Sequence, residues 1–546
     1  MTLIELVSRE AGSRRRRLIA SALFAGIANV LILVTLNLLV HFAEYREVRT
    51  LFLLLLFIAI YACCAHHTTS QTIGLIECAL ARVKLRVGEQ IAQAELAALE
   101  RVRAAEICDR LSENTALITD RAGAFATMMQ SLVILAFAAA YIAWISVPAF
   151  ALLTLLGVAG TLLLHTLRKD IVTAMAQSGK SRIVFLERLT DLLQGFKEAQ
   201  FSRRRRRELR DDIVEASDSL RAIAVRFSDF LSSGMILGEV VLFALLAAIV
   251  YTLHAHVPVG AWTLTHLIAA VMFIWAPFMT VATGIMPYMR SNLALDQIAA
   301  LEDKLAGAVH QVQGHAAPAE DPWQGRPGLI EARELAYTYS AEAGGEQFTI
   351  GPLDLQLVPG ELVFIVGGNG SGKSTLLKVL TGLYPPSCGT LSASGILIGP
   401  QNLDAFRNMI SAIFADFHLF AKLYGLAEMP ASTVQHLLTR MQLQDKLSYA
   451  DRTFSRLNLS TGQKKRLAMI VALLEDRPIC VFDEWAADQD PEFRRYFYEE
   501  LLPLLRRQGK TVVVVSHDDR YFHCADRVVT MEDGKIRSVA AAAVPA

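Results

Sequence analysis

The sequence predicts a six-helix α transmembrane domain followed by a cytoplasmic α/β domain. Three observations predict this fold class: six long apolar runs in the first half, basic residues that alternate between successive connections, and short runs rich in Val and Ile in the second half. A helix needs about 20 residues to cross a hydrocarbon core of about 30 Å, and each apolar run is about that long. The charged fraction of 19% is low for a soluble chain, which agrees with partial burial in a membrane.

The apolar runs lie in a predicted membrane domain that covers residues 1–312. Buried helices of a soluble protein would not repeat runs of this length with so few charges. The expected spans are 18–42, 51–71, 122–145, 148–167, 232–253 and 264–286.

The connections between the runs predict their orientation. Four arginines at 14–17 precede the first span, and the connections 72–121 and 168–231 are rich in Lys and Arg. The connections after the third and fifth spans contain neither residue. Because Lys and Arg concentrate in cytoplasmic loops, we expect both termini and both long connections to be cytoplasmic. Helix-forming residues, for example across 92–107, predict that the membrane helices continue beyond the bilayer.

Charge and cysteine content restrict the partners. Lys plus Arg and Asp plus Glu both number 53, so the net charge is +0, and no nucleic-acid partner is expected. The arginines at 203–207 are interpreted either as a site for anionic membrane lipids or as a solvated helix face, and the sequence favours neither. The 7 cysteines are scattered and odd in number, which predicts free thiols in a reducing compartment.

A linker is expected at 313–328, where Pro318, Pro322 and Pro327 interrupt the helical pattern. The predicted α/β domain covers 329–546. Its apolar runs 362–366, 479–482 and 511–515 are typical of strands that are buried on both faces of a largely parallel sheet.

Residues 367–374 match the phosphate-loop pattern G-x-x-x-x-G-K-[ST] in full, between an expected strand and an expected helix. Backbone N–H groups of such a loop surround phosphate oxygens, and the helix N-terminus adds positive potential. Lys373 is expected to reach the β- and γ-phosphates of ATP, and Ser374 to ligate Mg²⁺. The predicted ATP-binding residues here are Gly367, Asn369, Gly370, Ser371, Gly372, Lys373, Ser374 and Thr375.

A second expected strand ends in two acids, Asp483 and Glu484. A carboxylate beside a phosphate loop can hold Mg²⁺, and we assign this role to Asp483. Glu484 is then placed to orient and deprotonate the attacking water. Alone, such a strand end is a common surface feature. Next to a full phosphate loop it predicts ATP hydrolysis.

Residues 459–463 read Leu-Ser-Thr-Gly-Gln and precede an expected helix that begins with Lys464, Lys465 and Arg466. This stretch resembles the signature sequence of ABC ATPases, and its position between the phosphate loop and Asp483 matches that family. With six spans ahead of the ATPase domain, the whole chain resembles an ABC exporter half-transporter.

The resemblance implies further roles. Ser460, Gly462 and Gln463 would contact ATP that is bound to the phosphate loop of a second copy, so the resemblance implies a homodimer with two shared sites. His517 resembles the family's switch histidine and would act with Glu484. Tyr339 resembles the aromatic residue that stacks on adenine, and Asp490 occupies the aspartate position of the family's D-loop.

One position departs from the family pattern. Ala415 stands where a glutamine is expected in the loop that joins the nucleotide site to the membrane domain, within residues 413–420. Stretches 195–198, 411–420 and 459–466 resemble the cyclic-peptide exporter branch, which includes exporters of the pyoverdine precursor, syringomycin-type lipopeptides and a lasso microcin. The resemblance therefore implies a peptide-like cargo moved out across the bacterial inner membrane.

Two alternatives remain at this point. A lipid or lipopeptide flippase has the same architecture, and ATPase activity stimulated by lipid alone would favour it. A non-transport ABC-type ATPase, such as a DNA-repair or translation factor, is disfavoured by the six apolar runs and the zero net charge. An importer is disfavoured because importers that resemble this ATPase usually keep their membrane and ATPase parts on separate chains.

Overall fold

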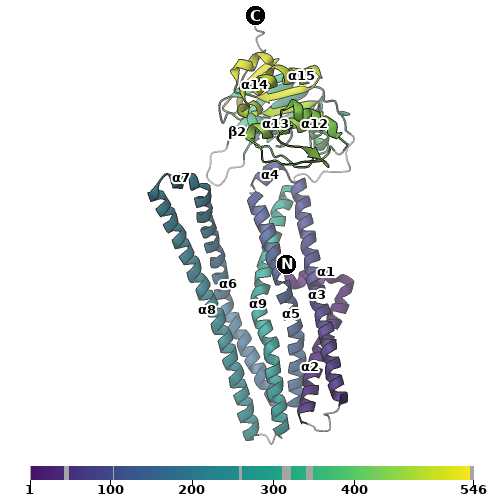
Figure 1. The fold of residues 1–546 in the computed structure, drawn as a ribbon, viewed down its shortest axis with the longest axis vertical. Helices are drawn as coiled ribbons and strands as arrows, with labels where there is room; N and C mark the ends of the chain where they lie inside the picture. The colour runs from purple at the N-terminus through teal and green to yellow at the C-terminus, as the bar shows by residue number, and fades with distance from the viewer. Residues whose placement is uncertain are drawn as a thin grey trace. The chain divides into compact units, whose positions relative to one another are not determined.

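The computed structural model describes residues 2–41, 48–101, 104–256, 261–309, 321–339, 348–426 and 428–541. The chain forms two compact units. The first comprises Met1–Leu85 and Cys108–Ala300, and the second comprises Arg86–Ile107 and Leu301–Ala546. The first is helical, and the second contains all the strands of the described residues, as Figure 1 shows.

Long helices dominate the first unit, and each expected span lies within one of them apart from residue 42, which is outside the described residues. The helices from the N-terminus onward are α1 (Leu3–Ala11), α2 (Arg15–His41), α3 (Val48–Gln93), α4 (Leu96–Arg101), α5 (Ala104–Ile145), α6 (Val147–Gln194), α7 (Phe196–Gln200), α8 (Arg203–His256) and α9 (Ala261–Val309), with the short 3₁₀ turn Gly12–Arg14 between α1 and α2. Of these, α4 lies in the second unit. The fold class predicted for this half, a helical transmembrane domain, is confirmed.

Four helical stretches of the described chain are long and apolar enough to cross a membrane: Leu3–Leu39, Val48–Gln93, Arg110–Ile145 and Leu264–Gly307. A shorter apolar stretch, Ser232–Ala248, coincides with much of the fifth expected span. The fourth expected span lies in α6, and most side chains of that span are outside the described set.

The helices of the first unit share an apolar core contributed by α2, α5, α6, α8 and α9. Gly26 on α2 and Gly284 on α9 lie against α5, where an added Cβ would come within 2.7 Å of Phe137 and 2.9 Å of Met128. Small residues let helix backbones approach closely, as membrane helices commonly do. Figure 1 shows α6 and α8 side by side, joined by α7.

The expected helix across 92–107 differs from the structure, which interrupts it. Helix α3 ends at Gln93 and the short α4 begins at Leu96, while residues 102 and 103 are outside the described chain. Leu96 and Ala97 of α4 pack against a core of the second unit. Burial of these side chains therefore sets a break that neither Pro nor Gly marks.

The second unit is built on a six-stranded sheet of order β12-β11-β3-β10-β9-β6, in which only β12 is antiparallel to its neighbour. A smaller antiparallel sheet has the order β2-β1-β4-β5, and β7 pairs with β8. The strands are β1 (Ile330–Thr338), β2 (Thr349–Leu357), β3 (Leu362–Gly367), β4 (Cys388–Ala393), β5 (Ile396–Leu397), β6 (Ile410–Ile413), β7 (Tyr449–Ala450), β8 (Thr453–Phe454), β9 (Ile479–Asp483), β10 (Thr511–Val515), β11 (Arg527–Glu532) and β12 (Lys535–Ala541).

Both faces of the six-stranded sheet are covered. Side chains of β3, β9 and β10 alternate between two cores, so that Phe364 packs in one core and Val363 and Ile365 in the other. This alternation explains why these strands read as continuous apolar runs. The helical segments of this unit are α10 (Lys373–Leu380), α11 (Leu403–Arg407), α12 (Ala431–Arg440), α13 (Thr461–Glu475), η3 (Trp485–Asp488), α14 (Pro491–Arg495), η4 (Tyr496–Leu501), α15 (Leu502–Arg507) and η5 (Asp519–Cys524).

Candidate functional site

The site forms where three parallel strands end together. Val515 of β10 is in register with both Ile365 of β3 and Asp483 of β9, so the segments that follow these strands emerge at one edge. Ligands of open α/β sheets bind at such carboxyl edges. The phosphate loop, the pair Asp483 and Glu484, and His517 all follow these strands, so the fold brings together three features that are separate in the sequence.

The phosphate loop closes around its own lysine. Lys373 begins α10, and its Nζ donates hydrogen bonds to the carbonyl oxygens of Gly367 at 3.0 Å and Gly368 at 2.8 Å. Gly372 has a φ of +95° and an added Cβ would lie 2.6 Å from Ile350, so only glycine fits there. Burial lowers the pKa of Lys373, while the charges of Glu484 and Asp483 act in the opposite direction.

Asp483 and Ser374 suit a divalent cation. Asp483 is 2% exposed, and among the described residues its Oδ1 has no hydrogen-bond partner. Burial raises the pKa of Asp483, against the effects of hydrogen bonds from the Ser374 side chain and the Ala415 backbone. A buried carboxylate oxygen without a partner, next to an exposed serine hydroxyl, offers the oxygen ligands that Mg²⁺ prefers.

Glu484 and His517 lie against each other. Oε1 of Glu484 is 3.0 Å from Nε2 of His517, and both side chains are partly exposed, at 35% and 44%. Glu484 has a φ of +49°, a left-handed conformation that is uncommon for a residue with a side chain. The two predicted catalytic residues meet because they follow adjacent strands, β9 and β10. No local sequence pattern predicts this contact.

Tyr339 lies near the helix of the phosphate loop. Its hydroxyl is 3.1 Å from Oγ1 of Thr375, and its ring contacts those of Phe348 and Tyr384. The ring is half-buried, so one part of it remains accessible beside the loop.

The signature residues lie elsewhere in the same chain. Ser460 caps the N-terminus of α13, where its hydroxyl accepts from the Gln463 backbone and the Gln463 side chain accepts from the Ser460 backbone. Within the described residues, no hydrogen bond or ion pair joins Ser460, Gly462 or Gln463 to the phosphate loop. A single chain therefore holds these two groups of predicted ATP-binding residues apart.

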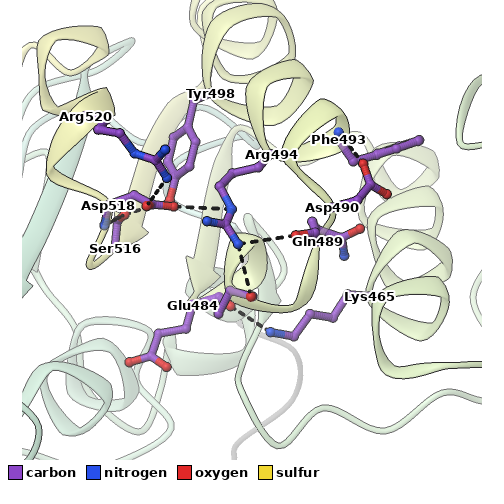
Figure 2. Close-up of polar contacts among 11 residues, drawn as sticks. Lys465, Glu484, Gln489, Asp490, Phe493, Arg494, Tyr498, Ser516, Asp518 and Arg520 are labelled. Carbon is purple, nitrogen blue, oxygen red and sulfur yellow. Dashed lines mark hydrogen bonds and ion pairs between the residues drawn. The ribbon is translucent and has the colours of Figure 1, made fainter.

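Three residues that the sequence did not single out hold the turn after β9. Lys465 Nζ donates to the Glu484 carbonyl oxygen, and the Trp485 indole donates to the Lys465 carbonyl, both at 2.7 Å. Arg494 approaches the carbonyl oxygens of Ala487 and Gln489 at 3.4 and 3.3 Å. Figure 2 shows Arg494 between these carbonyls and the carboxylate that follows His517. No local motif marks Trp485 or Arg494, and the signature-like stretch that contains Lys465 does not distinguish it from Lys464.

The D-loop position is also fixed by α13. Asp490 caps α14 by accepting from the Phe493 backbone, and its carboxylate pairs with Arg466. The Phe493 backbone hydrogen bond lowers the pKa of Asp490, and the charge of Arg466 adds to this effect. Gln489 donates to the Gly462 carbonyl oxygen at 3.1 Å.

Helix α4 contacts the helix of the phosphate loop. Glu100 of α4 pairs with Lys378 of α10 at 3.0 Å and accepts a hydrogen bond from Tyr384. The Tyr384 ring is 5.9 Å from that of Tyr339, measured between ring centroids. Burial raises the pKa of Tyr384, and its hydrogen bond to Glu100 adds to the shift. A chain of contacts thus joins α4 to the phosphate-loop segment without involving Ala415.

The chain is similar to known ABC transporters in sequence. A family model described as ABC transporter matches residues 350–487. The ATP-binding protein SyrD of Pseudomonas syringae pv. syringae is 34% identical over 430 residues, which cover 76% of this chain and 74% of that protein. An ATP-dependent lipid A-core flippase of Paraburkholderia xenovorans is 30% identical over 236 residues, or 40% of this chain and 39% of that protein.

The fold also matches a solved structure. A bacterial Atm1-family ABC exporter with ATP bound superposes with a TM-score of 0.69 at 17% sequence identity, and the match covers 96% of this chain and 95% of that one. The match extends over the helical half and the α/β half alike, so both parts of the predicted fold class are confirmed.

Proposed function

Since the chain belongs to the ABC transporter family, as an ATP-driven exporter with a cytoplasmic ATPase domain, we propose that it exports a peptide-like natural product across the bacterial inner membrane as a homodimer. The observation that carries this proposal is the convergence of the phosphate loop, Asp483, Glu484 and His517 at one sheet edge of a chain with long apolar helices.

The proposed hydrolysis follows from the positions of four side chains. Lys373 would leave the loop carbonyls for the β- and γ-phosphates of ATP, which are stronger acceptors. Glu484 would accept a proton from the attacking water, and His517, 3.0 Å from Glu484, would hold the carboxylate in place and contact the γ-phosphate. Asp483 and Ser374 would hold Mg²⁺, which neutralises charge on the phosphates when bound.

The homodimer is proposed because one chain separates the phosphate loop from Ser460 and Gly462. A second copy would bring its capped α13 N-terminus to the γ-phosphate, where backbone N–H groups and the helix dipole favour an anion. Each nucleotide would then lie between two chains, and the two sites would be equivalent.

The cargo proposal rests on the extent of the similarity. The match to SyrD covers 76% of this chain, so it includes much of the helical half as well as the ATPase domain. The matches to lipid A-core flippases cover 40%, about the length of the ATPase domain alone. Together with the stretches that resemble cyclic-peptide exporters, this favours a peptide or lipopeptide, while the flippase stays the second candidate.

ATP turnover by the purified protein in lipid nanodiscs tests the site. We expect Glu484→Gln to retain ATP binding and to lose about 100-fold or more in kcat, because the general base is removed. Lys373→Ala should weaken ATP binding as well. Wild-type turnover in both variants would show that the site assignment is wrong.

Metabolite profiling tests the cargo. A deletion strain of the host should retain a peptide-like compound in its cells. Complementation with the wild-type gene should restore export, and complementation with the Glu484→Gln gene should not. Comparison of nanodisc ATPase activity with lipid alone and with lipid plus the retained compound separates the candidates. Stimulation by lipid alone, with no retained peptide, would favour the flippase.

A further inference from the structure

Lys465 is a buried lysine next to an exposed one. It is 4% exposed, while Lys464 lies on the solvent side of the same helix, α13. Its ammonium has two acceptors at 2.7 Å, the backbone carbonyl oxygen of Glu484 and the carboxylate of Asp488. Figure 2 shows Lys465 reaching the backbone at Glu484. A buried ammonium requires such partners, so this side chain has a fixed position.

The acceptors of Lys465 flank the turn that aims the Glu484 side chain. Glu484 has a φ of +49° and a ψ of 34°, and its carbonyl oxygen also accepts a longer bond of 3.3 Å from the Ala487 backbone. The Trp485 indole donates to the Lys465 carbonyl at 2.7 Å, so Lys465 holds the turn through both its side chain and its backbone. A left-handed residue persists where its surroundings impose that conformation.

We propose that Lys465 is a positioning residue for ATP hydrolysis. By binding the carbonyl oxygen of Glu484, it fixes the backbone there and so directs the Glu484 carboxylate toward His517 and the attacking water. The inference rests on the proposed role of Glu484. Lys465 makes no contact with the nucleotide in this scheme and acts through Glu484 alone.

The position of Lys465 on α13 also connects the Glu484 carbonyl oxygen to the N-terminus of that helix. Ser460 caps the same helix five residues earlier, and in the proposed dimer it faces the nucleotide of the second copy. A displacement of α13 by that nucleotide would move Lys465, and with it the Glu484 carbonyl. The lysine thus connects the signature end of one site with the catalytic carboxylate of the other.

Steady-state and single-turnover hydrolysis by the full-length protein in nanodiscs test the inference. Lys465→Met removes the ammonium and keeps an unbranched side chain that extends to the ε position. We expect kcat to fall about tenfold or more, because small displacements of a catalytic group are costly. The KM for ATP should change by less than about twofold, because the phosphate loop is untouched. Hydrogen exchange in peptides that span 484–488 should become faster.

Lys510 supplies the matched control. It is also a buried lysine, and its ammonium contacts a carboxylate, that of Asp476 at 2.7 Å, and a backbone carbonyl, that of Arg477 at 2.8 Å. Both partners precede β9, at the opposite end of the strand from Glu484. Both Lys510→Met and Lys465→Met should lower thermal stability. Lys510→Met should nevertheless keep wild-type kcat and wild-type hydrogen exchange at 484–488.

Three outcomes would overturn the inference: wild-type kcat in Lys465→Met, equal loss of kcat in Lys510→Met, or a loss that appears wholly in KM. Lys465→Ala, whose cavity can admit water, carries the same expectation and serves if the Met variant does not fold. Glu484→Gln distinguishes a failure of the proposed role of Glu484 from a failure of the positioning role of Lys465. If it turns over normally, the role of Glu484 fails. If it is inactive while both Lys465 variants are normal, the positioning role alone fails.

Discussion

Asp483 and Glu484 are neighbours in sequence with opposite surroundings. Asp483 ends β9 and is 2% exposed, whereas the Glu484 side chain is 35% exposed because the backbone turns into a left-handed conformation between them. The buried carboxylate is suited to a cation, because its Oδ1 has no hydrogen-bond partner in the part of the chain that the structure describes. The accessible one is suited to water. The turn therefore gives the two adjacent acids the different surroundings that their two proposed roles require.

Gly462 gives a prediction at the residue scale. An added Cβ there would lie 2.7 Å from the Asp488 carbonyl oxygen, so Gly462→Ala must displace the segment between Glu484 and Asp490. We expect a destabilisation of about 1–3 kcal/mol, typical of overpacking, and a fall in kcat of about tenfold. Thermal unfolding and ATP turnover in nanodiscs measure the two effects.

Gly399 is the matched control for this substitution. An added Cβ at Gly399 meets only the Gln401 side chain, at 3.6 Å, which is an ordinary contact. Gly399→Ala should match the wild type in both measurements. Wild-type turnover in Gly462→Ala would contradict the close packing of the signature segment on the D-loop.

The sequence predicts some of these residues well and others not at all. The phosphate loop and the strand-end acids follow local rules, because their chemistry requires a fixed spacing between a strand and a helix. Lys465 follows no such rule. Lys464 and Lys465 are identical in type and adjacent, yet one is exposed and one is buried. Only the packing of α13 against the turn after β9 distinguishes the two lysines. This tertiary contact cannot be predicted from the local pattern of a single sequence.

Elements show a similar division. The strands at 362–366, 479–482 and 511–515 were predictable because burial on both faces leaves continuous apolar runs. The break around α4 was not predictable, because 92–107 is rich in helix-forming residues and contains neither Pro nor Gly. Leu96 and Ala97 pack on the core of the ATPase unit, and this tertiary contact overrides helix propensity.

Helix α4 provides a prediction at the element scale. It lies in the chain between α3 and α5, which contain the second and third expected spans, and its Glu100 contacts Lys378 and Tyr384. Because the methyl group of Ala415 cannot ligate Mg²⁺ or position a water molecule, we expect α4 to carry much of the signal between cargo and ATP. Glu100→Gln should leave basal turnover within about twofold and reduce its stimulation by cargo or lipid.

Hydrogen exchange and stimulated ATPase activity check this expectation together. Peptides that span α4 should exchange faster in Glu100→Gln, because an ion pair and a hydrogen bond are weakened. Glu89→Gln is the control, since Glu89 is an exposed glutamate on the preceding helix α3. Full stimulation in Glu100→Gln would show that the signal passes through other contacts.

At the scale of the whole molecule, the chain contains both groups of predicted ATP-binding residues, and no contact between the described residues joins the two groups. The phosphate loop lies at the carboxyl edge of the sheet, and Ser460 lies at the start of α13 without a contact to that loop among the described residues. The proposed homodimer resolves this separation by pairing the loop of one copy with the helix end of the other. This pairing can be tested without knowledge of the cargo.

The test compares two mixed dimers that contain the same two substitutions in different arrangements. Ser460→Asp keeps a good N-cap and places a negative charge opposite the γ-phosphate, while Lys373→Ala disables the phosphate loop. Each variant alone should be inactive. A dimer of one Lys373→Ala copy and one Ser460→Asp copy, purified through two different tags, retains one intact shared site and should show about half of the wild-type rate if the sites are independent.

The second mixed dimer pairs a wild-type copy with a copy that carries both substitutions. If the sites are shared, each site then has one defect and the dimer should be inactive. If instead Ser460 acts on the ATP of its own chain, the wild-type copy works alone and the two results exchange places. Ser460→Asn keeps the cap without the charge, and when it replaces Ser460→Asp both mixed dimers should be active. Loss of activity with Ser460→Asp is then attributable to repulsion of the phosphate rather than to an uncapped helix.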